Sequence, residues 1–438
     1  MHVAHARRAG QTSGGAMRDM PPPPARASAS STSSDAAVRA TNDEAAMSKA
    51  SCVRLGYLHD PFVRHFAAAP STAVHPHGSH GVMRPSPSGV RGGGLTGGRG
   101  GGGLNERRYP PLINRGYYAR VSAVRRAIDA FLSTPLTPCD DVVEARGISG
   151  VEGADADDER RGRRGSTGER QIVSLGAGSD TSYFRLRSEG RAPARYVEVD
   201  FPEVMRRKAG VVNAVDELRA LCVGGDGVAP VPGTASDAPA VGGEERAAVV
   251  LGDGGGYRLV SADLRDVSAL DAAVRASGFD PALPTLFVAE CCLVYVPPTE
   301  AAAVLSWAAA VASEAPASCV VLYDPIGPDD PFGRQMLINL EARGCPLIGI
   351  DGAPDLEAQR RRLRACGWEA SGASDMNGVY AALSRAAPAE VRRAERLEML
   401  DELEEWRLIQ GHYCVAWGVN ERVGGGGAEG PLFAAISL

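Results

Sequence analysis

The 438-residue sequence predicts an α/β protein built on a mostly parallel, seven-stranded sheet flanked by helices. Two observations lead to this prediction. From residue 171 onward, short apolar runs alternate with helical segments, and such alternation produces right-handed crossovers between parallel strands. The first apolar run leads into a glycine turn, Gly176-Ala177-Gly178, and acidic residues end the strands that follow. We therefore expect a Rossmann-like sheet whose carboxyl edge carries the functional site.

The sequence divides into a terminal extension and one large domain. Residues 1–41 are rich in Ala, Arg, Ser and Pro, and we expect them to form a disordered extension. An organelle transit peptide within residues 1–34 is the less favoured alternative. Residues 42–438 are expected to form the domain, which begins with a helical cap. Low-complexity composition predicts disordered insertions at 67–108, 139–169 and 223–256.

Composition argues against several classes of protein. The net charge of −6 disfavours nucleic acid as the main partner, and we interpret the Gly-Arg run at 89–103 as a solvated loop. Nine cysteines without paired short spacings disfavour a disulfide framework or a zinc ribbon, and we expect no metal. No apolar run reaches the roughly 18 residues of a membrane span, so no membrane partner is expected. We expect a cytoplasmic monomer.

The expected helices and strands follow the apolar pattern along the chain. A first helix is expected to begin at Asn42, and a second, amphipathic helix to span 110–132. Strands are expected at 171–176, 195–200, 257–262, 284–290, 318–323 and 413–419, with an edge strand over 431–438. Further helices are expected at 202–221, 332–343, 355–366 and 388–407.

Four consecutive strand ends carry residues suited to a nucleoside. Gly176 and Gly178 let a ligand approach the backbone closely. Asp200, at the end of the second strand, can accept hydrogen bonds from ribose hydroxyls. Asp263-Leu264 follow the third strand and would face an adenine, and Glu290 ends the fourth strand, near the reactive end of the ligand. This ordered series predicts a nucleoside-binding crevice.

The residues after the glycine turn separate two classes of cofactor. A dinucleotide site usually has a third glycine, but here Gly178 is followed by Ser179-Asp180-Thr181. The carboxylate of Asp180 disfavours a pyrophosphate and suits the cationic sulfonium and ammonium groups of S-adenosylmethionine. The sequence therefore predicts the layout of a class I S-adenosylmethionine-dependent methyltransferase.

Eight short motifs carry a family resemblance. They are 56–61 (GYLHDP), 113–120 (INRGYYAR), 175–181 (LGAGSDT), 198–202 (EVDFP), 262–266 (ADLRD), 289–295 (AECCLVY), 330–333 (DPFG) and 412–414 (HYC). Through them, over about residues 42–420, the chain resembles the leucine carboxyl methyltransferases. The resemblance implies methyl transfer from S-adenosylmethionine to the C-terminal leucine carboxylate of the protein phosphatase 2A catalytic subunit. The resulting methyl ester would regulate phosphatase holoenzyme assembly.

The resemblance also implies roles for particular side chains. It implies S-adenosylmethionine contacts at Lys49, Arg120, Gly176, Gly178, Asp200, Asp263, Leu264 and Glu290. Candidates for positioning the substrate are Arg115, Tyr117, Arg120 and Tyr295. No acid–base catalyst is expected, because a C-terminal carboxylate is already ionised at pH 7 and can attack the methyl group directly. The alternative is a small-molecule carboxyl or O-methyltransferase of the same fold.

Overall fold

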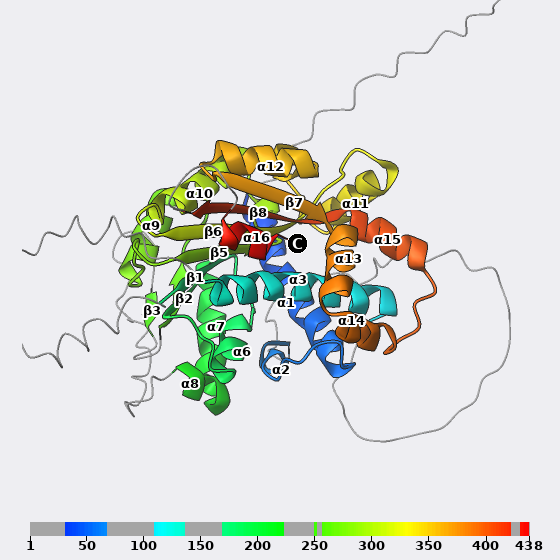
Figure 1. The fold of residues 1–438 in the computed structure, drawn as a ribbon, viewed down its shortest axis with the longest axis horizontal. Helices are drawn as coiled ribbons and strands as arrows, with labels where there is room; N and C mark the ends of the chain where they lie inside the picture. The colour runs from blue at the N-terminus through cyan, green and yellow to red at the C-terminus, as the bar shows by residue number, and fades with distance from the viewer. Residues whose placement is uncertain are drawn as a thin grey trace, which may run out of the picture.

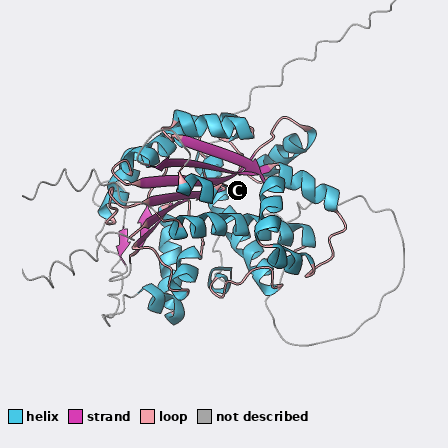
Figure 2. Ribbon diagram, viewed as in Figure 1, coloured by secondary structure: helices cyan, strands magenta, loops and turns pink. Residues whose placement is uncertain are grey.

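The computed structural model describes residues 31–67, 109–135, 169–222, 249–251, 256–421 and 430–437. In this part of the chain, helices pack against both faces of one sheet (Figure 1). Figure 2 shows the strands as a single central layer. The three expected insertions, and residues 1–30 of the expected extension, lie wholly or mostly outside the described residues.

Among the described residues, the sheet contains seven main strands, the predicted number, and one short addition, but residues 370–375 supply the seventh strand in place of the strand expected at 431–438. Its parallel part consists of β4 (Tyr257–Ser261), β2 (Arg195–Asp200), β1 (Gln171–Leu175), β5 (Thr285–Glu290) and β6 (Ala317–Pro325), side by side in that order. Next to β6 lie antiparallel β8 (Tyr413–Glu421) and then β7 (Ala370–Asp375) at the edge. At the other edge, β3 (Val249–Leu251) pairs antiparallel with β4. The predicted fold class is confirmed.

Helices cover the sheet in two groups. One face, together with the cap, is covered by α1 (Ser31–Arg54), α2 (Val63–Ala67), α3 (Pro111–Ser133), α6 (Ser182–Ser188), α7 (Pro202–Ala214), α8 (Asp216–Cys222), α13 (Met376–Ala386), α14 (Pro388–Glu395) and α16 (Pro431–Ile436). The other face is covered by α9 (Val267–Ala276), α10 (Pro298–Val311) and α12 (Leu356–Ala365). Of the remaining helices, α11 (Pro331–Ala342) follows β6 and α15 (Leu403–Gly411) precedes β8.

The central strand β1 shows why the site forms at one edge. All five residues of β1 are buried, with Ile172 packed on one face of the sheet and Val173 and Leu175 on the other. A central parallel strand is apolar throughout because helices cover both of its faces. Since β1, β2, β4 and β5 run parallel, their carboxyl ends meet at a single edge. The residues that follow these strands are thereby brought together.

The first helix begins earlier than the sequence predicts. Because α1 begins at Ser31, residues 31–41 of the expected disordered extension are helical. Residues distant in the sequence stabilise this part of α1, since Asp35 pairs with Arg265 and Arg39 lies over the ring of Phe201. Local sequence pattern cannot reveal such contacts, because most helical stability in proteins comes from tertiary packing.

Other expectations were wrong in element type or number. The segment expected as an edge strand at 431–438 forms helix α16, in which Leu432, Phe433 and Ile436 are buried. These three side chains lie on one helical face, and Pro431 is tolerated in the first turn. The single helices expected at 202–221 and 388–407 are each two helices, α7 with α8 and α14 with α15.

Two glycines allow tryptophan rings to pack against the strands at the β7 edge. A Cβ on Gly372 would lie 2.2 Å from the ring of Trp417, its register partner on β8. A Cβ on Gly418 would lie 2.7 Å from the ring of Trp368. Glycine is therefore required here by the close approach of the rings rather than by backbone conformation.

We expect Gly372→Val to lower the free energy of unfolding by about 1–3 kcal/mol, because Trp417 must move to admit the side chain. Urea denaturation measures this change. The matched control is Gly210→Ala in α7, where nothing lies within 4 Å of an added Cβ. That control should stabilise the protein by about 0.5–1 kcal/mol, since alanine favours a helix over glycine. Unchanged unfolding of Gly372→Val would contradict tight packing at this edge.

Candidate cofactor and substrate site

The glycine turn after β1 is held in a conformation that needs glycine. Gly176 and Gly178 have φ values of 65° and 50°, in the left-handed region that other residues rarely adopt. The backbone N–H groups of Gly176 and Ala177 donate to the carbonyl of Val199, at 2.8 and 3.1 Å. A Cβ on Gly176 would lie 2.3 Å from Sγ of Cys292. The turn therefore lies close against the β2 and β5 ends.

Asp200 lies where the sequence predicts a ribose acceptor. Its Oδ2 accepts from the N–H of Gly178 and its Oδ1 from the N–H of Phe201, both at 2.7 Å. Burial raises the pKa of Asp200 above its usual value, and these backbone N–H donors oppose that effect. Each carboxylate oxygen can accept more than one hydrogen bond, so the oriented carboxylate can still bind a hydroxyl pair.

At the end of β4, the third strand expected from the sequence, Asp263 makes ion-pair contacts that the sequence does not indicate. Asp263 is bound by the guanidinium of Arg265, at 2.6 Å for the shortest contact, and the same guanidinium reaches Asp35 of α1 at 2.8 Å. Leu264 is buried in the core on the α9–α10 side. The Arg265 guanidinium also lies 5.8 Å from the ring centroid of Phe201. Sequence reasoning identified Asp263 and Leu264 but missed Arg265, since arginine follows strands without any special signal.

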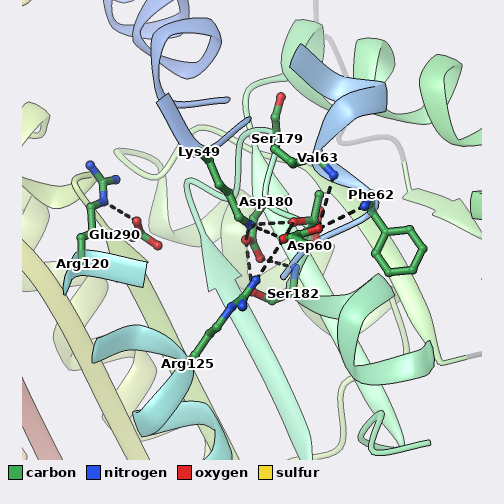
Figure 3. Close-up of polar contacts among 12 residues, drawn as sticks. Lys49, Asp60, Phe62, Val63, Arg120, Arg125, Ser179, Asp180, Ser182 and Glu290 are labelled. Atoms are coloured by element: carbon green, nitrogen blue, oxygen red, sulfur yellow. Dashed lines mark hydrogen bonds and ion pairs between the residues drawn. The ribbon is translucent and has the colours of Figure 1, made fainter. Parts of the chain in front are cut away.

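An ion pair lies at the end of β5, the fourth strand expected from the sequence. The guanidinium of Arg120, on α3, binds the carboxylate of Glu290, the last residue of β5, as Figure 3 shows. That guanidinium lies 5.1 Å from the ring centroid of Tyr117 and 4.9 Å from that of Tyr323. The structure thus brings together three predicted residues and adds Tyr323 of β6, which sequence reasoning missed.

Tyrosine and thiol groups surround this ion pair. Tyr323 stacks on Tyr413, with ring centroids 5.5 Å apart and ring planes 16° apart. Burial raises the pKa of Tyr117 and that of Cys291 to about 12. Cys291 adopts a φ of 51°, a strained value for a residue with a side chain, directly after Glu290. These hydroxyl and thiol groups are therefore neutral at pH 7, and their lining is suited to holding reactants rather than to moving protons.

The remaining substrate candidates lie in different places. Tyr295 is half-buried and packs against a small cluster that includes Leu347 and Ile350. Arg115 does not join the ion pair, because its Nη2 donates to the carbonyls of Glu395 and Glu398 at 3.1 and 3.2 Å. The guanidinium of Arg115 therefore serves the end of α14 and the turn after it.

Lys49 lies in a buried cluster of charges with Asp60 and Asp180, and Figure 3 shows their side chains pointing toward one another. Its Nζ lies 3.1 Å from Asp60, 3.5 Å from Asp180 and 2.6 Å from Oγ1 of Thr181. The Asp60 side chain is fully buried and also binds Arg125 at 3.1 Å. Lys49 thus neutralises internal carboxylates, a role that the resemblance did not indicate.

The expected role of Asp180 needs correction. Its carboxylate contacts Lys49, the hydroxyl of Ser182 and that of Tyr196, rather than standing free to meet a cationic cofactor. Although burial opposes the shift, the neighbouring Lys49 and Lys208 hold the pKa of Asp180 at about 2. Sequence reasoning could not anticipate this, because Lys49 and Lys208 come from helices distant in the chain.

Comparison with known proteins identifies the family. The leucine carboxyl methyltransferase family pattern matches residues 157–309. The leucine carboxyl methyltransferase 1 homolog of Arabidopsis thaliana is 35% identical over 389 residues, which cover 89% of this chain and 91% of that protein. This chain belongs to the leucine carboxyl methyltransferase family. The leucine carboxyl methyltransferase 1 of Bos taurus is 31% identical over 87% of this chain and 90% of that protein.

This leucine carboxyl methyltransferase is also similar to a longer protein, and it overlaps weakly with a solved structure. The tRNA wybutosine-synthesizing protein 4 of Homo sapiens is 35% identical over 86% of this chain, which spans only 43% of that protein. The phosphoethanolamine N-methyltransferase 2 of Haemonchus contortus, solved with S-adenosyl-L-methionine, overlaps with a TM-score of 0.30 and 9% identity over 57% of this chain and 48% of that one. Family membership makes this protein an S-adenosylmethionine-dependent methyltransferase.

The residues at the sheet edge fit this cofactor. Gly176 and Gly178 hold the turn after β1 in its left-handed conformation, and Asp200 presents an oriented carboxylate beside it. Asp263 and Glu290 place two further carboxylates at this edge, paired with Arg265 and Arg120 respectively. Across the described ranges, no three His, Cys, Asp or Glu side chains gather as metal ligands would. None of the helices in those ranges is long and apolar enough to cross a membrane.

We expect Lys49→Met to lower the free energy of unfolding by about 3–5 kcal/mol, because it leaves the buried Asp60 with less compensation. Chemical denaturation at pH 7 measures the loss. The control is Arg343→Met, which removes an exposed ion pair with Glu44 and should change stability by less than about 1 kcal/mol. Equal effects of the two substitutions would contradict a structural role for Lys49.

The pH dependence of Lys49→Met provides a second test. In the wild type, the pKa values of Asp60 and Asp180 lie below those of the unfolded chain, despite burial, because Lys49 is close. Their stabilising contribution is present above about pH 4 and is lost as the pH falls toward 2. Without Lys49, burial raises both pKa values, so the stability deficit of the variant should shrink as the pH falls from 7 to 4. A deficit that stays constant over this range would contradict the pairing.

We expect Asp200→Ala to raise the dissociation constant for S-adenosylmethionine about 10- to 150-fold, because a charge-assisted hydrogen bond is lost. Isothermal titration calorimetry measures this change. The matched control, Asp271→Ala, removes a carboxylate on α9 that pairs with Arg275 away from the site, and should leave the affinity unchanged. Unaltered affinity in Asp200→Ala would show that the β2 end does not hold the ribose.

Proposed function

We propose that this enzyme transfers the methyl group of S-adenosylmethionine to the α-carboxylate of the C-terminal leucine of the protein phosphatase 2A catalytic subunit. The methyl ester would regulate assembly of the phosphatase holoenzyme. One observation carries the proposal: the Arg120–Glu290 pair, lined by Tyr117 and Tyr323, lies at the β5 and β6 ends next to the glycine turn. An arginine among aromatic rings is suited to a substrate with a carboxylate and an apolar side chain.

The proposed chemistry requires positioning more than proton transfer. S-adenosylmethionine, when bound, supplies an electrophilic methyl group. Glu290 is placed to bind its ammonium group, and Arg120 bridges between Glu290 and the substrate carboxylate. The side chains of Tyr117, Tyr323 and Tyr413 exclude water from the reacting oxygen, which strengthens the attraction of Arg120 for it. Because the carboxylate is already ionised at pH 7, no side chain has to remove a proton.

The partners and location follow from the same proposal. The phosphatase catalytic subunit is the proposed protein partner, and we propose that the enzyme works as a cytoplasmic monomer. A second candidate substrate is tRNA, favoured by the 35% identity to a tRNA wybutosine-synthesizing protein. The net charge of −6 weighs against it, since tRNA binding is dominated by phosphate contacts. A small carboxylic acid is the third candidate.

A methylation assay distinguishes these substrates. Purified enzyme with labelled S-adenosylmethionine is expected to label the intact phosphatase catalytic subunit and to leave a version lacking the terminal leucine unlabelled. The labelled product should lose its methyl group in mild base, as an ester does. Equal labelling of both phosphatase forms would contradict the proposal, and labelling of tRNA or of small acids in place of the phosphatase would favour the other candidates.

We expect Arg120→Lys to lower kcat/KM for the phosphatase by roughly 10- to 100-fold. Lysine keeps the charge but lacks the planar guanidinium that packs against the rings of Tyr117 and Tyr323. Steady-state kinetics measures the loss, and calorimetry measures the affinity for S-adenosylmethionine. If the cofactor affinity falls by the same factor as kcat/KM, Arg120 binds the cofactor rather than the substrate.

A further inference from the structure

Exposed apolar side chains gather in one segment far from the core. The described residues leave six large hydrophobic side chains exposed, and four of them lie between the end of α14 and the last turn of α15: Leu397, Met399, Leu403 and Leu408. Met399 is 81% exposed, more than any of the others. Single exposed hydrophobic residues are ordinary, but four within residues 397–408 indicate an interaction surface. We name residues 397–408 the docking segment.

The start of the docking segment is fastened to the helix that carries Arg120. Arg115 of α3 donates to the carbonyls of Glu395 and Glu398, and Nδ2 of Asn114 donates to Oε2 of Glu398 at 2.9 Å. Both Asn114 and Arg115 are buried. These contacts give Arg115 a role that the sequence did not indicate. They fix where the exposed side chains begin relative to the substrate site.

Contacts of Trp406 and Leu408 hold the end of the docking segment against the rest of the protein. Trp406 of α15 is buried and meets the ring of Tyr380 edge-on, with centroids 4.8 Å apart. The imidazole of buried His412 lies between two acceptors, with Nδ1 2.8 Å from the carbonyl of Leu408 and Nε2 2.9 Å from Asp330. The apolar side chains are therefore presented on an anchored segment.

The docking segment is within reach of the substrate site. Helix α15 has nine residues, which corresponds to about 14 Å, and Tyr413 of the site follows it after His412. An extended peptide covers about 3.3 Å per residue, so roughly four or five residues span this distance. In Figure 1 the loop between α14 and α15 projects outward at one side of the molecule. A body bound there could deliver its own C-terminal tail to Arg120.

The charge of the docking segment indicates the chemistry of its partner. It contains five acidic residues (Glu398, Asp401, Glu402, Glu404 and Glu405) and one basic residue (Arg407), so its formal charge is −4. A surface that combines apolar side chains with acidic ones is complementary to a protein surface that carries lysine or arginine around an apolar patch. It would repel the phosphates of an RNA.

We propose that the docking segment binds the folded body of the protein substrate, through a basic and apolar surface of that substrate, while the tail enters the site. This inference rests on the proposed function, because it needs a substrate that is a folded protein with a C-terminal tail. The segment then contributes to the choice of substrate without touching the reacting atoms.

Two variants test the docking segment. Met399→Ser/Leu403→Ser removes apolar surface, and Glu402→Lys/Glu404→Lys reverses charge. Each should lower kcat/KM for the intact phosphatase about tenfold or more, while the affinity for S-adenosylmethionine and the melting temperature stay as in the wild type. The control, Glu314→Lys, makes one Glu-to-Lys reversal of the same kind at an exposed residue after α10 and should have no effect. Wild-type kcat/KM in both variants would overturn the inference.

Binding to the leucine-deleted phosphatase separates this inference from the proposed function. Biolayer interferometry should show that the wild-type enzyme still binds that phosphatase and that both docking variants bind it at least about tenfold more weakly. Equal binding by the wild type and the variants overturns the docking segment, even if methylation depends on the leucine. If binding is lost in the variants but labelling does not depend on the leucine, the docking segment stands and the proposed function fails.

Discussion

The buried carboxylate of Asp60 is the constraint on which the arrangement of the site depends. A fully buried anion must be compensated, and here Lys49 of α1, Arg125 of α3 and the hydroxyl of Thr181 all converge on it. These groups come from three separate parts of the chain. They meet only when helices α1 and α3 lie over the end of β1. Once Arg125 is fixed, α3 lies across the ends of β5 and β6. Arg120 on the same helix then reaches Glu290.

A second set of contacts extends the cap over the cofactor edge. Asn42 accepts from the N–H of Ser179 at 2.7 Å and donates to its hydroxyl at 3.0 Å, beside Gly178. Asp35, farther toward the start of α1, meets the Arg265 guanidinium that also holds Asp263. Helix α1 therefore contacts the residues that follow β1 and β4. The cofactor edge is built jointly by the sheet and by a helix that precedes it in the chain.

The sequence predicted those parts of the site that depend on local pattern. Gly176, Asp200 and Glu290 each follow an apolar run directly, and parallel strands must end at the same edge. Long-range charge pairing was not predictable in this way, because the sequence offers a lysine such as Lys49 many carboxylates as possible partners. Arg115 shows the same limit: its motif suggested a substrate contact, whereas the fold directs it to backbone carbonyls at the end of α14. Residues 431–438 were misassigned because a short apolar run fits either a strand or a helix.

The position of β7 at the margin of the sheet has a consequence for association between molecules. An edge strand offers free carbonyl and N–H groups to any other extended chain, which invites aggregation. Here the outer carbonyl of Ala373 already accepts from the guanidinium of Arg360 at 2.7 Å, and Ser371 donates to the Arg360 carbonyl at 3.2 Å. The strand itself is made of small residues with weak strand preference. The sheet thus ends in an edge that is a poor template for a neighbour.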